Sequence, residues 1–184
     1  MIRAPGAGLI AYLAFLVAER SIELGLSRRN AARVRARGAV EHGAEHYPWI
    51  VLLHTLWPIG LVTETVLGSA QPRPWWPFAL GAVVLANALR IAAMRALGDR
   101  WNTRILVVPG EPPVAGGIYR WLSHPNYVGV VIELAAAPLM FGAWRTAIVA
   151  SAANAVLLTI RIREEARALR EPAAPRVVTT TLRR

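Results

Sequence analysis

The chain has 184 residues, of which 55% are hydrophobic and 17% charged. This composition excludes an ordinary soluble domain, because the apolar residues come in long blocks. The lack of cysteine in the sequence excludes disulfides, thiolate nucleophiles and cysteine-ligated metal sites.

Five apolar segments predict an all-α, polytopic integral membrane bundle that forms a single domain over residues 1–171. Charged residues from Glu19 to Glu23 fall in the first segment and must reach the interface or pack inside the bundle. Prolines and glycines make 98–123 a structured loop, and the last two segments, short and joined by a tight turn, predict a helical hairpin. The five segments are about 8–26, 48–67, 77–97, 126–141 and 146–160, and 172–184 is predicted to be a flexible tail.

The arginines predict the orientation of this bundle. The net charge of +10 comes from 21 basic residues, all arginine, and most of them flank apolar segments. This placement favours contact with anionic lipid headgroups and argues against nucleic acid as a partner. With five crossings, one side has the basic loop 28–37, the 98–123 loop and the C-terminus, while the other has only Arg3, Arg73 and Arg145. The asymmetry predicts a bacterial inner-membrane protein with its C-terminus in the cytoplasm.

A first polar patch, residues 116–129, lies between the third and fourth apolar segments, on the predicted cytoplasmic side. Gly117 lets the backbone approach a ligand closely. His124 and Pro125 start the fourth helix, where proline suits the first turn and free N–H groups favour a carboxylate. Tyr127 and Trp121 offer aromatic faces to a cation such as a sulfonium.

A second polar patch, residues 161–165, closes the last apolar segment on the same side. Arg161 and Glu165 are four residues apart and therefore share one helix face, where the carboxylate could accept hydrogen bonds from an amine or a ribose. Together the two patches suit a zwitterionic nucleotide such as S-adenosylmethionine. The alternative is an interfacial loop with snorkelling arginines and a capped helix, and the residues alone leave both open.

A resemblance to a known family favours the first interpretation. The order Gly117-x-Tyr119, His124-Pro125-x-Tyr127-x-Gly129, an apolar hairpin and then Arg161-Ile162-x-x-Glu165 resembles the isoprenylcysteine carboxyl methyltransferase family. The resemblance covers about residues 97–169, and Trp101-Asn102-Thr103 is similar to a polar segment that the family carries upstream. It looks closest to a bacterial branch that resembles O-methyltransferases of alkylresorcinols and alkylpyrones.

The resemblance implies an integral membrane enzyme that binds S-adenosylmethionine in its C-terminal half, here 98–171. The N-terminal spans, here 1–97, would help to form a lipid-facing substrate entrance. The cofactor contacts implied are Asn102, Gly117, Tyr119, His124, Pro125, Asn126, Tyr127, Arg161, Glu164 and Glu165.

Three positions depart from the family pattern. Ser123 stands where an arginine is usual, which removes one possible cofactor contact, and Ile118 replaces a proline. The paired glutamates usually come four and five residues after the arginine, whereas Glu164 and Glu165 come three and four after it. We therefore expect Glu165 to matter more than Glu164.

Methylation of a phenol or enol benefits from a general base, whereas a carboxylate acceptor needs none. Glu133 is the first candidate base, because a carboxyl within an apolar segment is costly and is usually functional. The alternative is a pair with Arg90 or Arg120 that only joins helices. Arg90 could steer an acidic hydroxyl, or it could snorkel. His46 is a further catalytic candidate, although a solvated loop is an alternative, and no metal site is expected.

The sequence thus predicts an S-adenosylmethionine-dependent O-methyltransferase that acts on a lipophilic phenol, pyrone or carboxylate. An NADPH-dependent membrane reductase of related fold is one alternative. A non-catalytic membrane adaptor or permease component is another. The expected partners are a lipophilic small molecule and membrane lipid.

Overall fold

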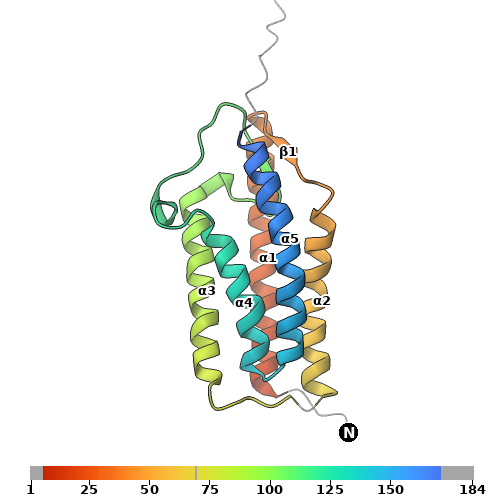
Figure 1. Ribbon diagram of the computed structural model, residues 1–184. Coiled ribbons are helices and arrows are strands. Elements are labelled where there is room, and N and C mark those ends of the chain that lie inside the picture. The colour runs from red at the N-terminus through yellow and green to blue at the C-terminus, as the bar shows by residue number, and fades with distance from the viewer. Residues whose placement is uncertain (1–5, 69, 171–184) are drawn as a thin grey trace, which may run out of the picture.

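Five α-helices form one bundle in the computed structural model, which describes residues 6–68 and 70–170 (Figure 1). This confirms the predicted all-α class. The predicted tail, 172–184, lies outside the described residues. The helices are α1 (Ala7–Ala36), α2 (Tyr47–Val66), α3 (Trp76–Leu97), α4 (Pro125–Met140) and α5 (Trp144–Ala168).

Three of these helices, α2, α3 and α5, are long and apolar enough to cross a membrane. The sequence predicted five crossings. The helix α4 is apolar but has only 16 residues. The helix α1 is long, but Glu23 and its charged neighbours lower its hydropathy; Glu23 is buried. Of the two alternatives for these charges, packing inside the bundle is the one observed.

Two short strands were not predicted from the sequence. The strand β1 (Val40–His42) pairs antiparallel with β2 (Ile105–Val107), so the chain after α1 is joined to the loop after α3. Three residues per strand are too few to show the two-residue alternation by which strands are recognised. Short 3₁₀ helices at Gly98–Arg100 and Gly117–Arg120 complete this loop region.

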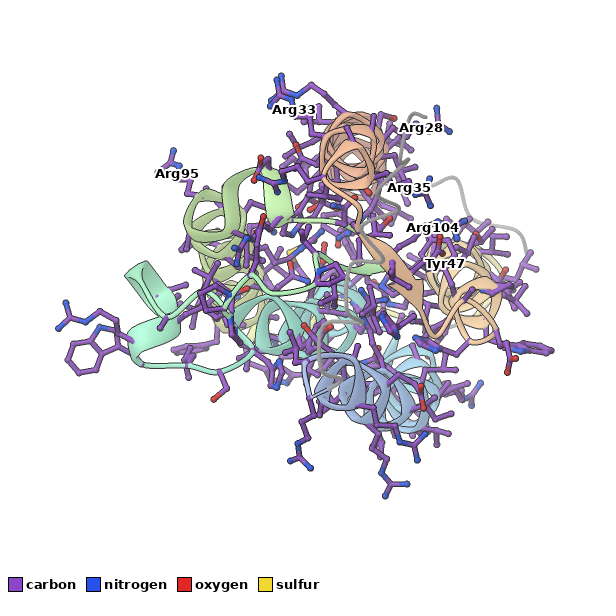
Figure 2. All side chains as sticks on the ribbon, turned by 90° about the horizontal axis from the view of Figure 1, so that it is seen from above. Arg28, Arg33, Arg35, Tyr47, Arg95 and Arg104 are labelled. Atoms are coloured by element: carbon purple, nitrogen blue, oxygen red, sulfur yellow. The ribbon has the colours of Figure 1, made fainter. Side chains whose placement is uncertain are left out.

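The loop region, the two strands and the C-terminal end of α5 all lie at one end of the bundle (Figure 1). Figure 2 looks onto this end and shows Arg33 of α1 and Arg95 of α3 pointing away from the bundle. Arg104 instead lies over the ring of Tyr47, 4.3 Å from its centroid. Exposed arginines thus surround the end of the bundle that holds the loop region and the two strands.

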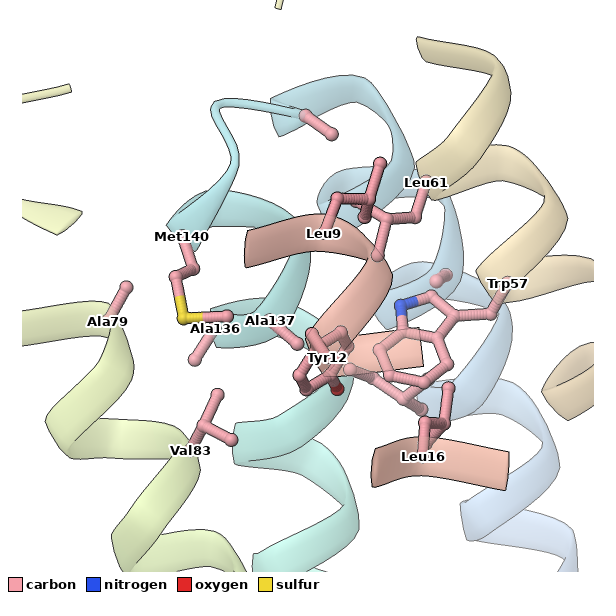
Figure 3. Packing of buried hydrophobic residues seen from close by; sticks show 13 residues of the cluster. Leu9, Tyr12, Leu16, Trp57, Leu61, Ala79, Val83, Ala136, Ala137 and Met140 are labelled. Carbon is pink, nitrogen blue, oxygen red and sulfur yellow. The ribbon is translucent and has the colours of Figure 1, made fainter. Parts of the chain in front are cut away.

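The hydrophobic core fills the opposite half of the bundle (Figure 3). Tyr12 of α1 packs there beside Phe141, with ring centroids 5.7 Å apart. Trp57 and Leu61 come from α2, and small residues such as Ala137 let α4 approach its neighbours closely. This core holds one half of the helices together and leaves the other half for polar residues.

Gly129 allows a close approach between α3 and α4. A Cβ atom at this position would lie 2.6 Å from Arg90 Cγ and 2.8 Å from the carbonyl oxygen of Ala86. We expect Gly129→Ala to lower the free energy of unfolding by about 1–3 kcal/mol, because α3 and α4 must separate to admit the methyl group. Gly81→Ala is the matched control, since nothing lies within 4 Å of its Cβ position. Denaturation of the purified protein in detergent measures both, and equal midpoints would contradict the prediction.

Candidate active site

The two polar patches meet where α4 begins and α5 ends. Tyr127 in the first turn of α4 donates its hydroxyl hydrogen to Glu165 Oε2 at 2.6 Å. Arg161 Nε donates to the Tyr127 hydroxyl oxygen at 2.9 Å. The antiparallel hairpin places these residues side by side, because α5 returns along α4 after a tight turn. Residues 34 to 38 positions apart thus form one hydrogen-bonded group.

His124 extends this group at the start of α4. Its ring stacks on Tyr127, with centroids 5.2 Å apart and planes at 14°. Its Nδ1 lies 3.9 Å from Glu165 Oε2. Pro125 follows at the first helical position and is buried. The proline fixes the first turn of α4, so the orientation of His124 and Tyr127 toward α5 is built into the helix start.

A cavity of about 210 Å³ with both polar and apolar walls lies beside this group and is here called the first cavity. Two buried polar atoms near it, Asn102 Nδ2 and Asn126 Oδ1, have no hydrogen-bond partner among the described residues. Such orphaned atoms are uncommon and indicate a bound molecule or water. The lining residues include Arg100, Asn102, Tyr119, Ser123, His124, Asn126, Tyr127, Arg161 and Glu165.

Tyr119 lines the first cavity from the loop. Burial, and then the neighbouring Glu165 carboxylate, raise the pKa of Tyr119 to about 12. The hydroxyl therefore stays protonated at neutral pH and can donate a hydrogen bond. The preceding Gly117 has φ +60°, and a Cβ there would lie 3.1 Å from the Ala96 side chain, so glycine fits the loop closely onto α3.

An apolar second cavity of about 300 Å³ adjoins the first. Its walls come mainly from α1, α2, α4 and α5, with Leu24, Val51 and Leu158 among its apolar residues. Leu24 and Val51 are also exposed on the outer surface of the bundle, at 44% and 46%. The cavity therefore reaches the surface that lipid would cover. The two cavities share Trp101, Asn102, Asn126, Tyr127 and Arg161.

A buried ion cluster joins three helices next to the second cavity. Arg90 of α3 is 2% exposed; its Nη1 lies 2.7 Å from Glu133 of α4 and 3.1 Å from Glu19 of α1, and its Nη2 binds Glu23. Arg20 lies 2.6 Å from Glu133 and 2.7 Å from Glu23. Three carboxylates thus share two guanidinium groups, which lowers the cost of burying them.

Seven of the ten predicted cofactor residues line the first cavity: Asn102, Tyr119, His124, Asn126, Tyr127, Arg161 and Glu165. Pro125 and Gly117 shape the backbone next to it. Glu164 does not line either of these cavities and pairs instead with Arg167 at 2.6 Å. This placement supports the expectation that Glu165 matters more than Glu164.

The three predicted catalytic residues lie in different places. Arg90 lines the second cavity, whereas Glu133 and His46 line neither cavity. Glu133 sits within the ion cluster, and its pairing with Arg90 supports the alternative in which it joins helices. His46 is 8% exposed beside Gly43, so it is not in a solvated loop; burial, and then Arg161, lower its pKa.

Sequence reasoning assigned no function to two residues of the second cavity, His54 and Asn154. Each is a polar residue in an apolar segment, and this feature was the only sign in the sequence that pointed to a function for either residue. Arg20 and Glu23 also line this cavity. From the sequence they were expected only to reach the membrane interface or to pack inside the bundle.

Fold and site together define an integral membrane helical protein in which a cavity of mixed polarity and a mostly apolar cavity share one wall. The chain belongs to the isoprenylcysteine carboxyl methyltransferase family, whose model matches residues 79–171. Membership in this family supports a membrane methyltransferase.

Two relatives are similar over most of the chain. An uncharacterized protein of Bacillus subtilis, YpbQ, is 42% identical over 160 residues, which cover 86% of this chain and 95% of the relative. An uncharacterized protein of Haemophilus influenzae is 22% identical over 157 residues, covering 85% of this chain and 91% of the relative.

Proposed function

We propose that the protein is an S-adenosylmethionine-dependent O-methyltransferase with a lipophilic acceptor. The observation that carries the proposal is the wall shared by the two cavities, which includes Tyr127 and Arg161. One polar and one apolar molecule bound in these cavities would meet at that wall. Methyl transfer is an in-line displacement and depends chiefly on this kind of positioning.

The residues of the first cavity fit the cofactor. Bound S-adenosylmethionine supplies a methyl group on a positively charged sulfur. Glu165 offers a carboxylate to an amine or a ribose, and Arg161 offers a guanidinium to a carboxylate. The rings of Tyr119 and Tyr127 suit a cation. Asn102 Nδ2 and Asn126 Oδ1 add a free donor and a free acceptor, both buried.

The second cavity supports a lipophilic acceptor, which we propose to be a phenol, pyrone or carboxylate of the alkylresorcinol, alkylpyrone or isoprenylcysteine kind. Its apolar walls suit a hydrocarbon chain, and its outer edge at Leu24 and Val51 offers a route from the membrane. Arg20, Glu23 and Arg90 form a polar inner wall that suits a hydroxyl-bearing headgroup.

We propose that the protein lies in a bacterial inner membrane with both cavities toward the cytoplasm. The arginines at the loop end of the bundle, among them Arg28, Arg33, Arg35 and Arg95, support this orientation (Figure 2). A cytoplasmic site also gives direct access to a soluble, charged cofactor.

Labelled methyl transfer tests the proposed function. Purified protein in lipid nanodiscs is incubated with methyl-labelled S-adenosylmethionine and an alkylresorcinol, an alkylpyrone or a prenylcysteine. We expect labelled product from at least one acceptor, and product from the polyketides alone would place the chain in that branch. A parallel titration with NADPH tests the reductase alternative. Tight NADPH binding without S-adenosylmethionine binding would contradict the proposal.

A further inference from the structure

His54 places an imidazole on the wall of the second cavity. It lies in α2, seven residues after Tyr47, and so about 10 Å along the helix from its start. The side chain is half-buried, and Val51 and Thr55 of the same helix line the cavity beside it. An imidazole on an apolar wall is exposed to whatever molecule fills that cavity.

A backbone contact fixes the tautomer of this imidazole. His54 Nδ1 lies 2.8 Å from the carbonyl oxygen of Ile50, one helical turn earlier. A carbonyl oxygen only accepts hydrogen bonds, so Nδ1 must carry the hydrogen. In the neutral ring Nε2 then has a free lone pair, and no hydrogen bond joins it to any described residue. The cavity wall therefore presents a nitrogen that can accept a proton.

The other titratable groups of this cavity are already engaged. Both carboxylate oxygens of Glu23 accept hydrogen bonds, one from Arg20 and one from Arg90. The hydroxyl group of Tyr47 is hydrogen-bonded to Thr103 at 3.1 Å, and that of Tyr127 to Arg161 and Glu165.

Charged groups on four other helices line the second cavity with His54 or form ion pairs with the groups that line it. They are Glu19, Arg20 and Glu23 of α1, Arg90 of α3, Glu133 of α4 and Arg161 of α5. Each carboxylate among them accepts at least one hydrogen bond from a guanidinium group, and Glu19 and Glu133 do not line the second cavity. Arginine does not lose its proton in proteins. Within the described chain, His54 Nε2 is therefore the proton acceptor best placed for a molecule in the second cavity.

We propose that His54 Nε2 is the general base that takes the proton from a hydroxyl acceptor. The acceptor oxygen forms a bond to the methyl carbon, the carbon–sulfur bond breaks with its electron pair staying on sulfur, and the hydroxyl proton moves to Nε2. The Ile50 carbonyl keeps Nδ1–H in place and so orients the imidazolium that forms. The proposal rests on the proposed methyltransferase function and assigns the base to α2 instead of Glu133.

A general base at His54 also indicates which class of acceptor the site methylates. A carboxylate acceptor has no proton to lose at neutral pH, so a base would serve no purpose for it. A phenol or an enol must lose its proton, and a positioned base accelerates such a step by about 10²–10⁴-fold. The site is therefore built for a lipophilic phenol or enolic pyrone, and prenylcysteine methylation should not depend on His54.

Histidine NMR tests the tautomer without any turnover. The full chain with ¹⁵N-labelled histidine has only four such side chains, so the His54 resonances can be assigned by their loss in His54→Gln, or by removing the other three in turn. We expect protonated Nδ1 and unprotonated Nε2 at neutral pH, and a shift of the Nε2 resonance when a long-chain alkylresorcinol is added. An Nε2–H tautomer, or resonances that do not respond to the resorcinol, would overturn the proposal.

Kinetics then separate this proposal from the general function. We expect His54→Gln to lower turnover of a hydroxyl acceptor about 10²-fold and to leave S-adenosylmethionine affinity within about twofold. Thr63→Val is the control on the same helix. Among the described residues the Thr63 hydroxyl bonds only to the Ile59 carbonyl, and Thr63 lines neither the first nor the second cavity. Full activity of His54→Gln on a hydroxyl acceptor that the unaltered protein methylates would overturn the base assignment. The methyltransferase function would then stand.

Discussion

Arg90→Ala is expected to lower the free energy of unfolding by about 3–5 kcal/mol, the largest stability effect predicted for a single substitution. The side chain is 2% exposed and binds Glu19, Glu23 and Glu133. Its removal leaves three carboxylates near Arg20 alone, and a buried charge without its partner is strongly destabilising. Thermal or denaturant unfolding in detergent measures the loss.

Two comparisons sharpen this test. Arg95→Ala removes an exposed arginine from the same helix and should change stability by less than about 0.5 kcal/mol. Arg90→Met combined with Glu133→Met removes one charge of each sign, so it should cost less than the sum of the two single changes. An Arg90→Ala protein as stable as the Arg95→Ala protein would show that the cluster does not hold the three helices together.

Glu165→Gln is expected to weaken S-adenosylmethionine binding by about 10- to 100-fold. The Glu165 carboxylate accepts the Tyr127 hydroxyl at 2.6 Å and lines the first cavity. Hydrogen bonds to charged groups contribute about 1.5–3 kcal/mol, which corresponds to that range. Isothermal titration of the purified protein measures the affinity.

The neighbouring carboxylate provides the matched control. Glu164→Gln changes the same group one residue earlier, but Glu164 pairs with Arg167 and does not line the first or second cavity. Its cofactor affinity should stay within about twofold of the unaltered protein. If Glu164→Gln weakened binding and Glu165→Gln did not, the assignment of the two glutamates would be reversed.

The meeting of the two patches could be predicted because it follows from chain geometry. His124 and Tyr127 precede a short hairpin, and Arg161 and Glu165 follow it, so an antiparallel return brings them to one end. The four-residue spacing of Arg161 and Glu165 placed both on one helix face. As a result, Arg161 donates a hydrogen bond to the Tyr127 hydroxyl oxygen, and the same hydroxyl donates one to Glu165.

Contacts between elements distant in the sequence could not be predicted in the same way. The sequence shows Glu19, Arg20, Arg90 and Glu133 as single charges in apolar surroundings, and only the packing of α1 against α3 and α4 pairs them. The pairing of β1 with β2 likewise depends on the fold, which brings the segment after α1 next to the segment after α3.

The functions of two further polar residues could not be predicted for the same reason. Glu64 was assigned no function, yet it accepts hydrogen bonds from the backbone N–H groups of Arg145 and Thr146 at the start of α5. A carboxylate satisfies free N–H groups at a helix start, but only the fold brings Glu64 there. His54 lines the second cavity, and the sequence alone does not show that this cavity exists.

An experimental structure with S-adenosylhomocysteine, the demethylated product of the cofactor, would show whether the first cavity is the cofactor site. We expect density for this molecule in the first cavity, in contact with Tyr127, Arg161 and Glu165, and with its sulfur toward the wall shared with the second cavity. Density at another site, or an empty first cavity in protein that binds the molecule in solution, would contradict this expectation.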